Sequence, residues 1–120
     1  MEPINFVDLK KQYSAIESDV NESLSAILKS GQFILGPVVE EAEEALSKYT
    51  NAKHTITVSS GTDALFVSLL ALGIGRGSKV FIPAFTYTAT AEVIALLGAE
   101  PAFVDVDEDT YNISCESLIT

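Results

Sequence analysis

The first thirty residues carry a helical pattern of hydrophobic positions. Between Asp8 and Lys29, apolar residues recur at steps of three and four, the spacing of one face of an amphipathic helix. These residues are Leu9, Tyr13, Ile16, Val20, Leu24, Ile27 and Leu28. Asp8 suits the N-cap, and Gly31 suits the position after the helix, where glycine readily adopts the left-handed conformation. We therefore predict a helix between these two residues.

A second helix is predicted over residues 38–49. The stretch GQFILGP (31–37) has the composition of a loop, and Pro37 fits the first turn of a helix, where no backbone N–H is needed. Glutamates fill the first turns and Lys48 lies near the end, which complements the helix dipole. The apolar side consists of Val39, Ala42, Leu46 and Tyr49.

After residue 50, short β-type runs alternate with helical patterns. TITVS (55–59) alternates as a strand does, and AFVDV (102–106) is a further strand. KVFIPA (79–84) is apolar on both faces, as expected for a strand of a parallel sheet that is covered on both faces. This order favours an α/β domain with parallel strands and right-handed crossovers. Three strands is few against the usual ~4–6, and the final SLIT has no stop signal, so we expect a piece of a longer protein.

The helices of this second part differ in how much of their surface is apolar. Residues 62–72 are apolar almost all round, so we expect a well-buried helix there. A helix over 89–97 should end at Gly98, and another should begin at Ser114. We predict two domains: residues 1–50 as an N-terminal helical segment, and residues 51–120 as the start of an α/β domain.

Charge and composition exclude several classes of partner. The net charge is −10, with 17 acids against 7 bases, which disfavours binding to nucleic acid. The chain is 48% hydrophobic and 20% charged, as in globular proteins, and no apolar run approaches the ~20 residues of a membrane span. The one cysteine cannot form an internal disulfide, which fits a reducing compartment. We expect a cytoplasmic protein without a membrane segment.

The junction SSGTD (59–63) allows two interpretations. It could be a capping box, with Ser60 as N-cap and Asp63 accepting the Ser60 N–H. It could also bind a phosphate, because free N–H groups and the helix dipole attract an anion, Gly61 permits close approach, and the hydroxyls of Ser60 and Thr62 add hydrogen bonds. Ligands of open α/β sheets bind at this carboxyl edge of the strands.

The junction PAFTYTATAEV (83–93) should lie at the same edge. Phe85, Tyr87 and three threonines are unusual for a plain connector. The aromatic residues could pack in the core, or they could form a platform on which a flat heterocycle stacks, which would contribute ~0.5–1.5 kcal/mol beyond burial.

Signals for a metal or for a nucleophile are weak. Asp105, Asp107, Asp109 and Glu116 have the spacing of a calcium loop, but the sixth position is Thr110 instead of glycine and a strand precedes the run. The single histidine has no cysteine or acid at ligand spacing. We expect no metal site and can name no nucleophile–base pair.

Four stretches together carry a resemblance to a known family. GQFILGP, SSGTDAL, GIGRGSKVFIPAFTYTATAEVI and GAEPAFVDVDEDTYNI, in this order, are similar to the N-terminal part of the DegT/DnrJ/EryC1/StrS family. Its members are pyridoxal 5′-phosphate (PLP)-dependent aminotransferases that act on nucleotide-linked keto-sugars. The resemblance implies an incomplete parallel-sheet large domain of the fold-type I PLP-dependent transferase fold, preceded by N-terminal helices. It also implies a homodimer, and glutamate as the amino donor.

The resemblance implies roles for particular residues. Ser60, Gly61 and Thr62, with the Asp63 N–H, would bind the PLP phosphate, and Tyr87 would stack on the pyridine ring. The loop that contains Phe33 would lie near the active site across the dimer, close to the substrate.

No residue of this chain is predicted to be catalytic. PLP chemistry needs a lysine for the internal Schiff base and an acid opposite the pyridine nitrogen. The pattern puts no lysine of this chain at the carboxyl edge of a strand, and in the family both groups come from later sequence. Two alternatives stay open: a PLP-dependent sugar dehydratase of the same family, and a module that binds a phosphorylated ligand without chemistry.

Overall fold

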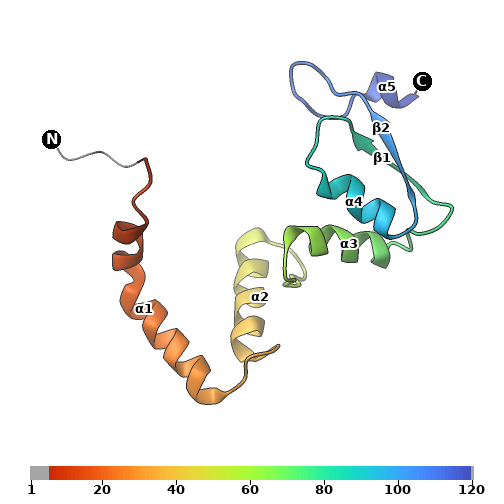
Figure 1. The fold of residues 1–120 in the computed structure, drawn as a ribbon. Coiled ribbons are helices and arrows are strands. Elements are labelled where there is room, and N and C mark those ends of the chain that lie inside the picture. Colours follow the sequence, from red (N-terminus) through yellow and green to blue (C-terminus); the bar gives the residue numbers. More distant parts are fainter. Residues whose placement is uncertain (1–5, 120) are drawn as a thin grey trace. The chain divides into compact units, whose positions relative to one another are not determined.

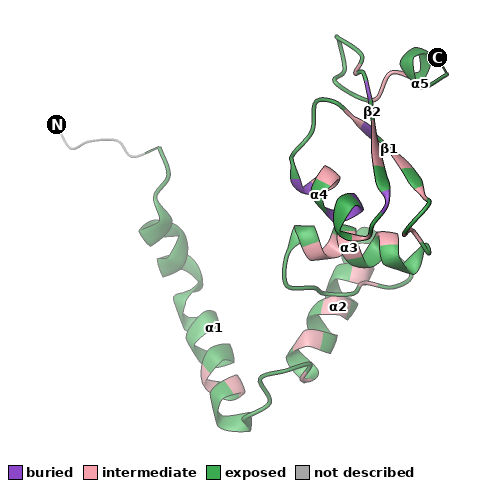
Figure 2. Cartoon of the chain, turned by 45° about the vertical axis from the view of Figure 1, so that its right-hand side comes forward, coloured by how far each residue is buried: buried purple, intermediate pink, exposed green. Residues whose placement is uncertain are grey.

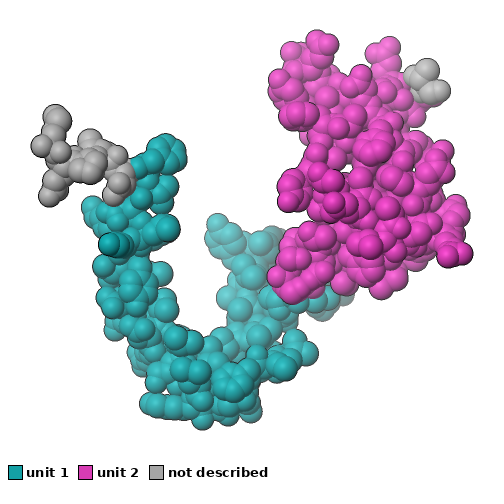
Figure 3. Space-filling model, in the orientation of Figure 1, with its two compact units in different colours: residues 1–57 teal, residues 58–120 magenta. Residues whose placement is uncertain are grey.

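The computed structural model describes residues 6–119, which form five helices and two strands (Figure 1). In chain order these are α1 (Leu9–Ser30), α2 (Pro37–Thr50), α3 (Gly61–Ala71), β1 (Lys79–Pro83), α4 (Ala89–Leu96), β2 (Glu100–Val104) and α5 (Cys115–Ile119). Contacts divide the chain into unit 1, residues 1–57, and unit 2, residues 58–120 (Figure 3). The domain boundary predicted after residue 50 stays a prediction.

The ends of α1 are set by its local sequence, as predicted. The Lys11 N–H donates to Asp8 Oδ1 at 3.0 Å, so Asp8 is the N-cap. Gly31 follows the helix with φ of 69°, and its N–H donates to the Ile27 carbonyl. The predicted apolar face is largely exposed, with Leu9 69% and Leu28 61% accessible.

Helix α2 begins at Pro37, which occupies a position where a helix needs no backbone donor. Asn51 follows its last residue in the left-handed conformation, with φ of 56°. The helix over 38–49 and the loop before it are therefore confirmed, each to within a residue or two.

The strand predicted at residues 55–59 is wrong: this segment has no regular secondary structure. Side chains of α2 hold it instead. Glu43 Oε1 accepts the Thr57 N–H at 2.7 Å and the Thr57 hydroxyl at 2.8 Å, and the Ser47 hydroxyl donates to Thr55 Oγ1 at 2.9 Å. Glu43 and Ser47 are four residues apart on the helix, which is about 6 Å along its axis. Thr55 and Thr57 are two residues apart in extended chain, which is about 6.6 Å, so each threonine lies opposite its partner on α2. A strand also needs a neighbouring backbone, and no described strand pairs with these residues.

The sheet of unit 2 has two parallel strands in the described chain. Lys79 pairs with Glu100 at the start of the register and Pro83 with Val104 at its end. Helix α4 makes the crossover between β1 and β2, and contacts both of them. The strands predicted at 79–84 and 102–106 and the crossover helix predicted at 89–97 are thus confirmed, with β2 two residues earlier than expected.

The core of unit 2 lies between α4 and the sheet (Figure 2). Val93 and Ile94 are each only 1% exposed, and they cluster with Ile82 of β1 and Ala99 before β2. Phe66, Leu69, Ile74, Val80 and Ala91 pack against this cluster. This core holds α4 against β1 and β2.

Two expectations about burial are wrong for the described residues. Helix α3 contains no buried residue, although it was expected to be well buried; Leu65, Val67 and Leu70 are 41–55% exposed. The sheet was expected to be covered on both faces, but Phe81 is 55% exposed while its neighbour Ile82 is buried. The cause is the same in both: only the α4 side of these elements meets other described residues.

Candidate functional site

The turn from Ser59 to Asp63 leads into α3. Ser60 has an extended backbone and caps the helix, since its hydroxyl accepts the Asp63 N–H at 3.1 Å and its carbonyl accepts the Ala64 N–H at 3.0 Å. Helix geometry leaves the N–H groups of Gly61 and Thr62 without an acceptor inside the helix. Two donors therefore point out of the amino end of α3, together with its positive dipole end.

Only one half of the predicted capping box is present. The Asp63 carboxylate accepts the hydroxyl of Ser59, and not the N–H of Ser60. The N–H of Asp63, proposed as a phosphate donor, is occupied by Ser60 in this structure, so the open donors are those of Gly61 and Thr62. Nothing lies within 4 Å of a Cβ built on Gly61, and Ser60 and Thr62 are exposed.

The aromatic residues after β1 are exposed. Phe85 is 70% and Tyr87 is 80% accessible, so the core-packing alternative does not hold within the described chain. Phe85 meets a residue that the sequence did not single out: the rings of Phe85 and Tyr111 lie 5.6 Å apart at an interplanar angle of 43°. Tyr87 ends the loop just before α4, where its carbonyl accepts the Thr90 N–H at 3.0 Å.

These features share one side of unit 2. The amino ends of α3 and α4 lie on the same side in Figure 1, and the loop that carries Phe85 and Tyr87 runs from the carboxyl end of β1 to the start of α4. The turn at Ser60 and the aromatic loop therefore lie toward the same side of unit 2.

Phe33 belongs to unit 1. Residues 31–37 and Glu40 line an open hollow of about 530 Å³, and Phe33 is 66% exposed beside it. Leu35 has a positive φ of 47°, which a leucine rarely adopts. The predicted place of this loop near the substrate stays a prediction.

The acidic loop after β2 is organised by its own hydrogen bonds. Asp107 Oδ1 accepts the Thr110 N–H at 3.0 Å, the Thr110 hydroxyl at 3.1 Å and the Asp109 N–H at 3.1 Å. These bonds, first that from the Thr110 backbone, hold the pKa of Asp107 below its usual value. No group of three or more His, Cys, Asp or Glu side chains within residues 6–119 is arranged to hold a metal ion.

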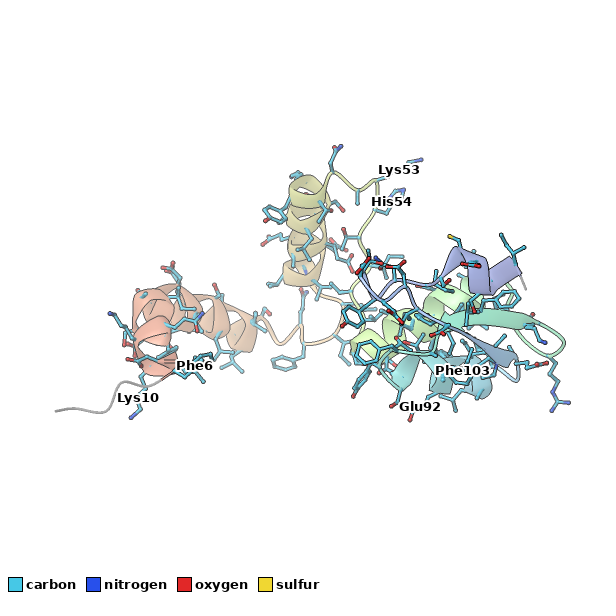
Figure 4. The ribbon with its side chains drawn as sticks, turned by 90° about the horizontal axis from the view of Figure 1, so that it is seen from above. Phe6, Lys10, Lys53, His54, Glu92 and Phe103 are labelled. Carbon is cyan, nitrogen blue, oxygen red and sulfur yellow. The ribbon has the colours of Figure 1, made fainter. Side chains whose placement is uncertain are left out.

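Within unit 2, lysine is found at the opposite end of β1 from the aromatic loop. Lys79 is the one lysine of unit 2; it begins β1, about 16 Å of strand from the aromatic loop, and pairs with Glu100 at 3.0 Å. Lys53 and His54 are neighbours in the exposed segment after α2, and Lys10 lies on α1 (Figure 4). None of the lysines follows the carboxyl end of a described strand.

A protein-family model described as the DegT/DnrJ/EryC1/StrS aminotransferase family matches residues 14–120. The chain belongs to this family. The resemblance carried by the four sequence stretches is thereby confirmed. None of the helices in the described part of the chain has both the length and the apolar character that a membrane span needs.

Relatives within the family agree in sequence and in structure. The UDP-2-acetamido-2-deoxy-3-oxo-D-glucuronate aminotransferase of Pseudomonas aeruginosa is 46% identical over 115 residues, which are 96% of this chain and 32% of that protein. A crystal structure of a DegT/DnrJ/EryC1/StrS aminotransferase from Brucella abortus is 48% identical, with a TM-score of 0.88 over 98% of this chain and 31% of that one.

A third relative was solved with a cofactor. NtdA from Bacillus subtilis with bound cofactor PMP is 31% identical, with a TM-score of 0.86 over 99% of this chain and 28% of that one. The predicted fold class, a partial fold-type I α/β domain preceded by helices, is therefore confirmed. The chain spans about a third of the length of these family members.

Sequence reasoning missed two features of the site. It did not single out Tyr111, because a tyrosine with φ of 57° leaves no local signal; asparagine or glycine would have indicated that conformation. It also missed the hydroxyl of Ser59 as the partner of Asp63. The pattern Asp-x-Asp-Thr could have indicated the turn at Asp107, since Asp and Thr side chains commonly bond backbone N–H groups two or three residues on.

Proposed function

We propose that the intact protein is a PLP-dependent aminotransferase that transfers an amino group, from glutamate, to a nucleotide-linked keto-sugar. Membership of the family supports the reaction class. The relative from Pseudomonas aeruginosa, named for a UDP-linked 3-oxo sugar, supports the class of acceptor. The observation that carries the proposal within this chain is the turn at Ser60, where two N–H donors are free and no side chain fills the space at Gly61.

The residues present fit the phosphate of PLP. An anion at the amino end of α3 would accept the N–H groups of Gly61 and Thr62 and gain from the helix dipole. The exposed hydroxyls of Ser60 and Thr62 add two further donors. The Asp63 carboxylate, which would repel a phosphate, is bonded to Ser59. The net charge of −10 does not attract anions to the surface, so the local donors must supply the affinity for the phosphate.

Tyr87 would supply a flat surface for the cofactor ring. Its side chain is 80% exposed on the side of unit 2 that carries the turn, so it is available for stacking. Offset stacking contributes about 0.5–1.5 kcal/mol beyond burial. Phosphate and ring would then be fixed at two points, which orients the cofactor.

PLP, when bound, supplies an electron sink for the chemistry of the amino group. In this proposal the present chain binds and orients the cofactor, and the lysine and the acid come from another part of the intact protein. We further propose that the protein is a homodimer in the cytoplasm and that Phe33 lies near the substrate. The 120-residue chain by itself is expected to be inactive.

The test uses the full-length protein with PLP. Addition of L-glutamate should change the absorbance from the pyridoxal to the pyridoxamine form, and a later keto-sugar nucleotide should reverse the change. D-glutamate serves as the control. If PLP binds but no amino donor changes the spectrum, transamination is excluded, and this result supports the alternative function of a PLP-dependent sugar dehydratase. If PLP does not bind at all, the cofactor assignment is wrong.

A further inference from the structure

Two loops of unit 2 are joined by an aromatic contact. Phe85 comes from the loop between β1 and α4, and Tyr111 from the loop between β2 and α5; their ring centroids are 5.6 Å apart. Figures 1 and 2 both show the second of these loops beside the end of β1. Phe85 and Tyr111 remain 70% and 63% exposed, so the contact joins two surface loops and is not part of the core.

Tyr111 is held in an unfavourable backbone conformation. Its φ is 57°, where residues with a Cβ lose about 1 kcal/mol or more. Hydrogen bonds around Asp107 maintain it: the Tyr111 N–H donates to the Asp107 carbonyl at 2.8 Å, and the Asp107 N–H donates to the Asn112 carbonyl at 2.9 Å. A strained residue that its surroundings fix in place is a reason to ask what its side chain does.

The aromatic loop has few restraints of its own. At one end the Ala84 N–H donates to the Val104 carbonyl at 2.7 Å, which extends the sheet by one bond. At the other end the Tyr87 carbonyl accepts from Thr90 at 3.0 Å. Thr86 contributes one long hydroxyl contact to Thr90 at 3.4 Å. Between these ends, the ring of Tyr111 contacts Phe85 of the loop.

We propose that Tyr111 is a positioning residue for the cofactor: by holding Phe85 it sets the conformation of the loop that presents Tyr87, two residues later. The inference rests on the proposed function, because Tyr87 is the residue assigned to the cofactor ring. Tyr111 acts through Phe85 and need not touch the cofactor. Its ring carries this role, and its hydroxyl does not.

The test compares three single variants of the full-length protein and the double variant Tyr111→Asn/Phe85→Leu. Tyr111→Asn removes the ring but tolerates a positive φ, so the loop at Asp107 is kept. Tyr111→Phe is the matched control that keeps the ring. Phe85→Leu removes the other partner. An aromatic pair of this kind corresponds to about a two- to tenfold change in an equilibrium constant.

Three measurements are made on each variant. We expect Tyr111→Asn and Phe85→Leu to weaken PLP binding about two- to tenfold. Both variants should also reduce the circular dichroism that the bound cofactor shows in its visible band, and should speed amide hydrogen exchange in residues 84–88 of the cofactor-free protein. Tyr111→Phe should match wild type in all three. The double variant should lose no more than the larger single loss, because both changes break one contact.

The outcomes separate this inference from the proposed function. If wild type binds no PLP, the proposed function is wrong and the inference falls with it. If wild type binds PLP, and Tyr111→Asn keeps wild-type affinity, dichroism and exchange, this inference alone is wrong. Equal losses in Tyr111→Phe and Tyr111→Asn would also overturn it, since they would assign the role to the hydroxyl. A variant that fails to fold is replaced by Tyr111→Gly, which also accepts the positive φ.

Discussion

Ser60 offers a direct test of whether the amino end of α3 is only a capped helix or also an anion site. Serine, asparagine and aspartate cap helices about equally well. Ser60→Asn therefore keeps a neutral cap, whereas Ser60→Asp keeps the cap but puts a negative charge beside the donors of Gly61 and Thr62. Ser60→Ala removes the acceptor of the Asp63 N–H, which is 3.1 Å away in the structure.

The expected magnitudes separate the two roles. Loss of the cap in Ser60→Ala should lower the free energy of unfolding by about 1 kcal/mol, and the other two substitutions should change it by less than about 0.5 kcal/mol. A carboxylate about 4 Å from a phosphate charge costs about 1 kcal/mol in water and about 4 kcal/mol near a protein surface. Ser60 is exposed, so we expect a value toward the lower end: a loss of PLP affinity of about tenfold or more.

The assay is PLP titration of the full-length protein, followed by absorbance, with urea unfolding of the cofactor-free protein as the stability measure. Ser60→Asp should bind PLP at least about tenfold more weakly than Ser60→Asn at equal stability, and added salt should narrow the gap. Equal affinity in these two variants would refute the assignment of the turn to the phosphate and leave only the cap.

Other predictions follow from single contacts and from exposed surface. Glu43→Gln should destabilise the protein at neutral pH, because hydrogen bonds from Thr57 lower the pKa of Glu43 below 4.5 in the folded state. In urea unfolding at several pH values, the difference in unfolding free energy between wild type and variant should be fully present above pH 4.5 and should vanish as the pH falls through the folded pKa. Ile94→Ala should cost about 2–5 kcal/mol in the same assay, whereas Leu96→Ala, on the same helix but 72% exposed, should change stability by less than about 0.5 kcal/mol. Gly98→Ala should lower the free energy of unfolding by about 1 kcal/mol or more, because φ is 75° and the added Cβ would lie 3.1 Å from the Arg76 side chain. The midpoint of thermal unfolding should fall accordingly. The 120-residue chain by itself should scatter light as an oligomer or aggregate, and a stable monomer of 12.8 kDa would contradict this.

The helices could be predicted because their ends depend on neighbouring residues. Asp8 and Gly31 bound α1, Pro37 begins α2, and Ser60 caps α3; each acts within four residues through a side chain or a fixed backbone angle. The turn that we propose for the phosphate could be predicted for the same reason: a cap and a glycine at the start of a helix leave free N–H donors that depend on local sequence alone.

The strands and the burial depended on tertiary structure. A run such as TITVS becomes a strand only where another backbone accepts its hydrogen bonds, and here Glu43 of α2 takes that place. The apolar sides of α3 are buried only if something packs against them. The sequence determined the helices, their caps and the donors of the site, because these are local. Only the tertiary structure decided the pairing of Phe85 with Tyr111, because residues 26 positions apart meet through the parallel register of β1 and β2.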